Sequence, residues 1–131
     1  MMKKYIIFLS LLASTFFTSC KKEKEDECIE TITSDILSAD GPSVGTVNQD
    51  INFTLTYPII NGCGKFEELT ESAQGNSRVV TVKSKYTGCI CTQYYETLTT
   101  RYIFKTTTPG TYFLNFMQDD GTALVDTLMI N

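Results

Sequence analysis

Hydrophobic and polar side chains alternate in short segments through most of the chain, and Gly, Pro, Asn and Asp separate these segments. Residues 50–57 show the pattern most clearly. The hydrophobic residues of that segment are Ile51, Phe53, Leu55 and Tyr57, with a polar residue between each pair. Strict alternation of this kind is typical of a β-strand with one buried face. The segment therefore predicts a half-buried strand.

The same alternation predicts four further strands, at residues 77–86, 94–105, 111–117 and about 123–130. In the first three of these the inward-facing side chains would be Val80, Val82, Tyr86, Leu98, Tyr102, Phe104, Tyr112, Leu114 and Phe116. The inward face of the last strand is ambiguous. β-Branched residues dominate these segments and favour strands over helices.

Two other segments complete the set. The isoleucines of residues 29–38 do not alternate strictly, so this strand has a short helix as its alternative. Residues 64–70 form the other strand, with Phe66 as its expected core residue. Seven short strands with turn signals about every ten residues predict one all-β domain, a seven-stranded antiparallel sandwich of two sheets.

The first 19 residues read as a secretory signal peptide. Lys3 and Lys4 provide its positive start, and a run of about 13 mostly apolar residues follows. A bilayer-spanning helix needs roughly 20 apolar residues. This run is therefore too short to remain as a transmembrane anchor, and we expect the segment to be cleaved.

The signal peptide ends in Phe17-Thr18-Ser19-Cys20, which resembles the lipobox of bacterial lipoproteins. The resemblance implies that Cys20 becomes the first residue and carries the lipid, although Phe17 replaces the usual aliphatic residue. An ordinary signal peptide followed by a chance cysteine is the alternative. Several acyl chains on Cys20 would hold the protein stably at a membrane, whereas a single chain binds only marginally.

Seven consecutive charged residues follow Cys20, and such a segment cannot pack in a core. We expect residues 20–27 to form a lipidated cysteine and a solvated tether, and residues 28–131 to form the folded domain. The charged stretch also resembles the surface-export signals of some Gram-negative lipoproteins. The expected location is the cell envelope, anchored to the outer membrane and facing either the periplasm or the cell surface.

Composition narrows the chemistry. The net charge is −4 and no basic stripe occurs, which argues against nucleic acid as a partner. The chain has no His, so the commonest general base and metal ligand are missing. The carboxylates of Glu67, Glu68 and Glu71 lie on one segment, whereas glycoside hydrolysis needs two carboxylates across a cleft. We read Asp119-Asp120-Gly121 as a plain turn. No enzymatic activity and no cofactor are predicted.

The stretch TTTPGTYFLNF, at residues 106–116, resembles the entry into the sixth strand of immunoglobulin-like domains. The resemblance implies that Tyr112 is a tyrosine-corner residue, whose hydroxyl bonds back to the chain. Leu114 stands where antibody domains carry a cysteine, with Leu55 across the core, and Phe66 is the nearest substitute for the missing Trp. The folded part resembles small immunoglobulin-like lipoproteins of Gram-negative bacteria, a family that implies no activity.

Four cysteines follow the tether, and an even number in an exported protein predicts disulfides. The immunoglobulin-like topology would bring Cys28, Cys63, Cys89 and Cys91 to one end of the sandwich. Cys89 and Cys91 would point the same way on an extended chain and would not bond each other. Each should therefore pair with Cys28 or Cys63, and both assignments remain open.

The same four cysteines have two alternative interpretations, a thiolate site for zinc or Cu(I) and a redox role. The paired Cys-x-x-Cys spacing of structural zinc sites is absent, so we predict no bound metal. A candidate ligand patch comprises the outward-facing Tyr95, Arg101 and Phe113, whereas Tyr94 should face inward. The predicted function is a non-catalytic binding or structural module with a protein or glycan partner. An envelope metal-handling protein is the alternative.

Overall fold

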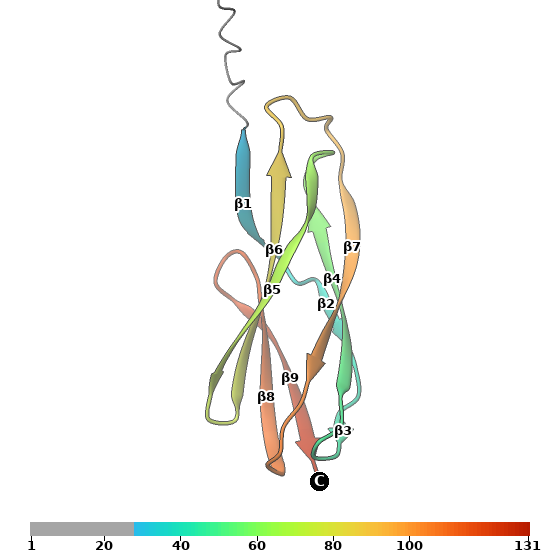
Figure 1. Ribbon diagram of the computed structural model, residues 1–131, viewed down its shortest axis with the longest axis vertical. Coiled ribbons are helices and arrows are strands. Elements are labelled where there is room, and N and C mark those ends of the chain that lie inside the picture. Colours follow the sequence, from blue (N-terminus) through green and yellow to red (C-terminus); the bar gives the residue numbers. More distant parts are fainter. Residues whose placement is uncertain (1–27) are drawn as a thin grey trace, which may run out of the picture.

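The computed structural model describes residues 28–131, and all its regular elements are strands (Figure 1). The nine strands are β1 (Ile29–Ser34), β2 (Ser38–Asp40), β3 (Val44–Gly45), β4 (Ile51–Ile59), β5 (Gly64–Gln74), β6 (Ser77–Thr87), β7 (Glu96–Phe104), β8 (Gly110–Met117) and β9 (Ala123–Ile130). Over this range the chain has no helix long and apolar enough to cross a membrane. The signal peptide, Cys20 and the tether lie outside the described residues.

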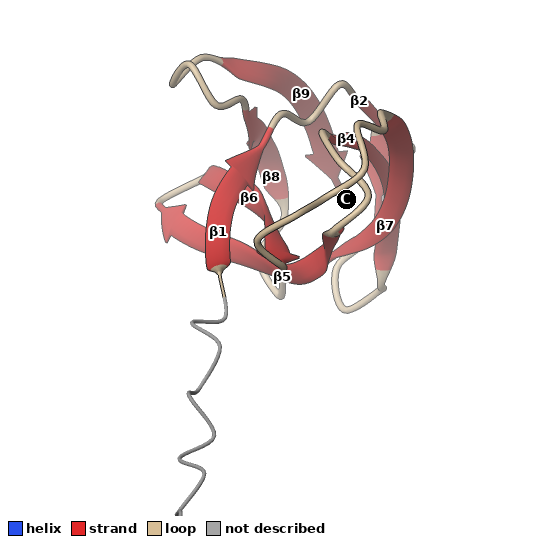
Figure 2. Cartoon of the chain, turned by 90° about the horizontal axis from the view of Figure 1, so that it is seen from above, coloured by secondary structure: helices blue, strands red, loops and turns tan. Residues whose placement is uncertain are grey.

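The strands form two sheets that pack face to face (Figure 2). The larger sheet has the order β1-β6-β8-β9-β3, and β5 pairs with the other edge of β6. The smaller sheet has the order β2-β4-β7. The predicted all-β sandwich of two sheets is therefore confirmed.

The described residues form nine strands rather than seven, because the N-terminal segment divides between the sheets as β1 and β2 and the short strand β3 is additional. β1 pairs with β6 in the larger sheet, and β2 pairs with β4 in the smaller one. The chain crosses at Ile36, whose side chain is fully buried. Its backbone N–H donates to Met117 O of one sheet at 3.3 Å, and the next N–H, of Leu37, donates to Thr56 O of the other at 2.8 Å. This change of sheet explains why the isoleucines do not alternate.

Two pairings are parallel, which corrects the purely antiparallel arrangement predicted. β6 runs parallel to β8 from Ser77 to Val80, and β3 runs parallel to β9. β6 has 11 residues, and it pairs with β8 along its first half and with β1 along its second half. One long strand thus accommodates two partners on the same edge, with β5 on the opposite edge.

The core lies between the sheets and contains most of the side chains that alternation predicted to face inward; Tyr86 is buried outside the cluster, and Leu98 is only partly buried against it. β4 is the clearest case, since its four predicted core residues are each at most 5% exposed. In β9 the ambiguity is resolved, because Leu128 and Ile130 are buried. The buried cluster comprises Ile36, Ile51, Phe53, Leu55, Tyr57, Ile59, Val80, Val82, Tyr102, Phe104, Tyr112, Leu114, Phe116, Leu128 and Ile130.

The prediction that Phe66 is a core residue is wrong, because 44% of its surface is exposed. β5 is an edge strand, and its register with β6 shifts between Phe66 and Glu68. A bulge of this kind re-aims side chains. The Phe66 ring lies beside that of Tyr57 at a centroid distance of 6.3 Å, at the rim of the sandwich.

Candidate functional site: the cysteine pole

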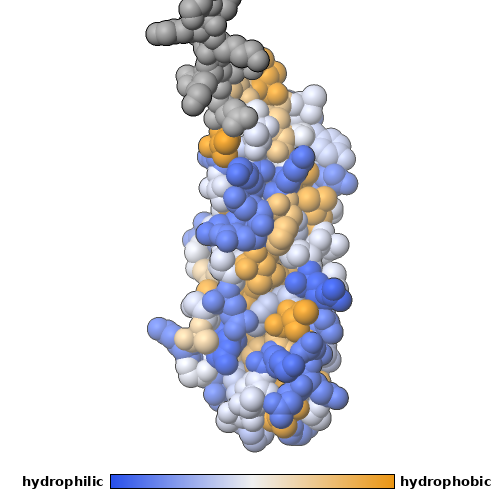
Figure 3. Space-filling model, viewed as in Figure 1, coloured by the Kyte–Doolittle hydropathy of each residue, from blue (hydrophilic) through white to orange (hydrophobic). Residues whose placement is uncertain are grey.

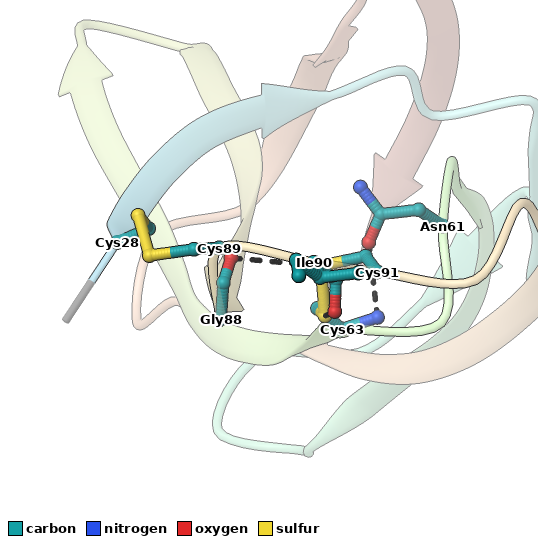
Figure 4. The surroundings of a disulfide bond; sticks show 7 residues. All are labelled: Cys28, Asn61, Cys63, Gly88, Cys89, Ile90 and Cys91. Atoms are coloured by element: carbon teal, nitrogen blue, oxygen red, sulfur yellow. Dashed lines mark hydrogen bonds between the residues drawn. A yellow bond between two sulfur atoms is a disulfide. The ribbon is translucent and has the colours of Figure 1, made fainter. Parts of the chain in front are cut away.

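Four cysteines meet at one end of the sandwich and form two disulfides (Figure 4). Cys28 pairs with Cys89 at a Cα–Cα distance of 4.9 Å, and Cys63 pairs with Cys91 at 5.5 Å. Both distances lie in the normal range for disulfides. The predicted disulfides are confirmed, and the structure selects one of the two assignments left open. We call this end the cysteine pole and define it as residues 28–30, 59–64 and 87–95.

Backbone hydrogen bonds hold the three segments of the pole together. Asn61 Oδ1 accepts a hydrogen bond from Cys63 N at 2.9 Å, which forms a tight turn after β4. Gly62 N donates to Thr92 O at 3.0 Å, and Gly88 N donates to Cys28 O at 2.8 Å. The last two bonds cross between segments of the pole and add to the covalent links that the disulfides make.

Gly88 is required at its position for two reasons. Its φ of +135° lies in a region that residues with a side chain rarely adopt. A Cβ atom there would also lie 3.1 Å from Cys63 Sγ and 3.8 Å from Cys91 Sγ. The absence of a side chain therefore allows the chain to turn closely over the second disulfide.

A shallow hollow of about 320 Å³ lies at the pole. It is lined by Cys28, Ile29, Glu30, Asn61, Tyr86, Gly88, Cys89 and Cys91. The Tyr86 hydroxyl accepts a hydrogen bond from Ile60 N at 3.1 Å. Burial, and to a lesser extent the nearby Tyr86, raises the pKa of Tyr57. Bridged sulfurs cannot act as thiolates, so the hollow has few reactive groups and could contact a ligand only through its shape.

The alternative of a thiolate metal site requires sulfurs that are not bridged, and all four form disulfides here. Within residues 28–131, no group of three or more Cys, Asp or Glu side chains is arranged to hold a metal ion. The short distance of 3.6 Å between Cys91 Sγ and Gly88 O is a packing contact, because a bridged sulfur carries no proton. The pole is built as a covalent clamp.

The three carboxylates singled out in the sequence do not face one another across a cleft. Glu68 accepts a hydrogen bond from Lys83 Nζ at 2.7 Å, which raises the pKa of that lysine. Glu67 accepts one from Thr31 Oγ1 at 2.7 Å and lies 3.8 Å from Lys85 Nζ. Both carboxylates thus link β5 to β6, and Glu67 also reaches across β6 to β1.

Glu71 has a different environment, which the sequence did not indicate. Its Oε2 accepts a hydrogen bond of 2.6 Å from the hydroxyl of Tyr102, a core residue of β7 in the opposite sheet. Burial and this carboxylate raise the pKa of Tyr102 well above its ordinary value. Arg78 pairs with Glu71 at 3.4 Å and lies over the rings of Phe104 and Tyr112. This cluster joins β5, β6 and β8 of the larger sheet to β7 of the smaller sheet.

The candidate ligand patch is not brought together. Arg101 lies on the outer side of β7 in the smaller sheet, whereas Phe113 lies on the outer side of β8 in the larger one. Tyr95 belongs to the loop before β7, at the pole, and is 65% exposed. The prediction that Tyr94 faces inward is wrong, because this loop is not part of the strand and Tyr94 is 49% exposed. Its hydrogen bond to Glu96 raises its pKa.

Two other predicted positions have clear local structures. The Tyr112 hydroxyl donates to Thr108 O at 2.9 Å, and its oxygen lies 2.8 Å from Thr106 Oγ1, so it bonds back to the preceding turn. In the turn after β8, Asp120 Oδ1 accepts hydrogen bonds from Thr122 N and Oγ1, which lower its pKa. A hydrogen bond with Asp35 raises the pKa of Asp119. These contacts stabilise the turn between β8 and β9 and join it to Asp35, directly after β1.

The architecture defines the class of the molecule as a two-sheet β-sandwich domain with a disulfide clamp at one end. A family model described as the ORF11 beta-sandwich domain matches residues 50–129, which run from just before β4 almost to the end of β9. Because this match covers more than half of the chain, the protein belongs to the ORF11 beta-sandwich domain family. The matched segment contains Cys63, Cys89 and Cys91 but not Cys28. No curated protein and no solved structure matches the chain significantly.

Proposed function

We propose that this protein is a lipid-anchored, non-catalytic module of the bacterial cell envelope. Acyl chains on Cys20 would hold it at the outer membrane, and the sandwich would bind or position a protein or glycan. The observation that carries the proposal is the pair of disulfides next to the segment that resembles a lipobox. Disulfides persist in exported proteins and are rare in the cytosol.

The arrangement of side chains supports a binding or structural role over catalysis. The three candidate carboxylates each have a hydrogen-bond or ion-pair partner, and they lie along β5 rather than across a cleft. General acid–base catalysis needs a group placed against a substrate site with a pKa near the working pH. These three carboxylates instead link strands to one another, which favours a binding or structural role.

Replacing the anchor cysteine tests the proposal. The Cys20→Ala variant, expressed in a Gram-negative host, should move from the membrane fraction to the soluble fraction. The matched control is the C28A/C89A double variant, which loses a disulfide but should remain in the membrane fraction. Retention of Cys20→Ala in the membrane fraction would contradict the anchor. Added protease on intact cells would then distinguish a surface location, with rapid loss of the domain, from a periplasmic one.

A further inference from the structure

The cysteine pole exposes hydrophobic side chains that the disulfides do not require. Its two loops, residues 59–64 and 87–95, contain no charged residue. Ile60 is 57% exposed, and Tyr94 and Tyr95 are about as exposed. Charged residues flank these loops: Glu30 belongs to the third segment of the pole, Lys65 and Glu96 directly follow the two loops, and the charged tether ends at Glu27.

Ile90 is the most exposed large hydrophobic residue of the described chain, at 95%. It lies between Cys89 and Cys91, and each neighbour is fixed by a different disulfide (Figure 4). An apolar side chain on a mobile loop must be ordered when it binds, and this ordering weakens binding. The two disulfides have already fixed the backbone on both sides of Ile90. The tip of the pole is therefore a preorganised apolar contact.

The pole is also the end of the domain that adjoins the N-terminal segment. Figure 3 shows hydrophobic surface beside the point where that segment enters. Seven residues lie between Cys20 and Cys28, and even a fully extended chain over these eight steps spans at most about 29 Å. An anchor at Cys20 would keep the pole close to the bilayer at a high effective concentration, so a weak apolar contact would suffice for docking.

The opposite end of the sandwich has a different surface. There the loop between β7 and β8 carries Lys105, whose Nζ lies 3.0 Å from Asp50 Oδ1. Between Lys105 and β8 the loop is Thr106-Thr107-Thr108-Pro109, without a large apolar side chain. This end also exposes Val44 and Met129, each 52%, but it carries the Lys105–Asp50 ion pair, whereas the two loops of the pole carry no charge and present aromatic side chains.

We propose that the cysteine pole, with Ile90 at its tip, docks into the interfacial region of the bilayer that holds the lipid anchor. The proposal rests on the proposed function, because the anchor brings the pole to the membrane. Apolar side chains at such a surface enter about 5–10 Å into the boundary between headgroups and acyl chains. Tyr94 and Tyr95 suit the headgroup level, where an aromatic ring can be buried while its hydroxyl stays hydrated. No charge in the two loops would have to be desolvated.

The chain contains no Trp, so one introduced Trp gives an unambiguous fluorescent reporter. The Ile90→Trp variant and a Thr107→Trp control at the opposite end would be purified as full-length exported protein from membranes. Both would be reconstituted into zwitterionic phospholipid vesicles, with or without brominated acyl chains. We expect Ile90→Trp to show blue-shifted emission and to lose most of it in brominated vesicles, with no change on raising the salt concentration. Thr107→Trp should keep its emission. Tyr95→Trp provides the same readout should Ile90→Trp not fold.

The outcomes separate the inference from the proposed function. Acylated protein in which neither pole variant is quenched would overturn docking while leaving the anchor in place. Blue-shifted emission in native membranes without quenching in brominated vesicles would assign the pole to a protein partner, which also overturns docking. The intact mass of the same samples reports acylation. Protein without acyl chains on Cys20 would overturn the proposed function and, with it, the docking that depends on the anchor.

Discussion

Replacing both cysteines of one disulfide by alanine is expected to destabilise the sandwich by an amount that depends on which pair is removed. Cys28 and Cys89 are separated by 61 residues, and Cys63 and Cys91 by 28. A disulfide restricts the unfolded chain, and the lost entropy grows with the logarithm of the loop length. For the two loops this relation gives about 4.3 and about 3.6 kcal/mol. C28A/C89A should therefore cost more stability than C63A/C91A.

The two closed loops overlap between Cys63 and Cys89, so the effects of removing both disulfides should be smaller than the sum. Equilibrium urea unfolding of the non-reduced variants measures each free energy of unfolding. The matched control is the same series with a reducing agent. There the stability of the wild type should fall to that of the variant in which Cys28, Cys63, Cys89 and Cys91 are all replaced by alanine. A larger loss for C63A/C91A than for C28A/C89A would refute the entropic reasoning.

Three further outcomes follow from the same structure. Tyr102→Phe removes the hydrogen bond to Glu71 and should lower the free energy of unfolding in urea by about 1–2 kcal/mol. An unchanged free energy of unfolding would contradict a role for this bond in joining the sheets. The folded state raises the pKa of Tyr102 above 10.0, so the contribution of the Tyr102 hydroxyl to stability is complete below pH 10 and declines as the pH rises further. Alkaline absorbance titration should show a tyrosine that ionises only on unfolding. Gly88→Ala should lower the free energy of unfolding by about 1–3 kcal/mol, since the φ of Gly88 is +135° and Cys63 Sγ lies close. Gly75→Ala is the control and should cost less, because Gly75 has a φ of +56° and open space around it. Equal losses for the two variants would contradict the argument from crowding.

Alternation along the chain predicted the sandwich well because each strand has one face on the core. The side chains of β4 keep their period of two from Ile51 to Tyr57, and those of β8 keep it from Tyr112 to Met117. Phe66 failed because burial also depends on where the strand lies in its sheet. A residue on an edge strand next to a bulge can be apolar and still face the rim.

Long-range pairings were beyond the sequence for a different reason. The parallel alignment of β6 with β8 joins segments that are separated in the chain by the whole of β7, and neither strand carries a local signal of its partner. The crossing at Ile36 did leave a trace, since the isoleucine spacing departs from two, but the same spacing also fits a helix. Local periodicity identifies faces and does not select neighbours.

The candidate site divides in the same way. The strand directions of the expected immunoglobulin-like topology were enough to place the four cysteines at one pole, and their even number was enough to predict disulfides. Which cysteine pairs with which depends on a difference of two residues between Cys89 and Cys91, and only the folded loop settles it. The contact of Glu71 with Tyr102 has no sequence signal, because it joins an edge strand to the opposite sheet.

The most direct test of the account is the intact mass of the mature protein extracted from membranes of a Gram-negative host. The account predicts a chain that begins at Cys20 and carries the added mass of acyl chains, with two hydrogens fewer for each of the two disulfides. A chain that begins at another residue, or at Cys20 without acyl mass, would contradict the lipid anchor on which the proposed function depends.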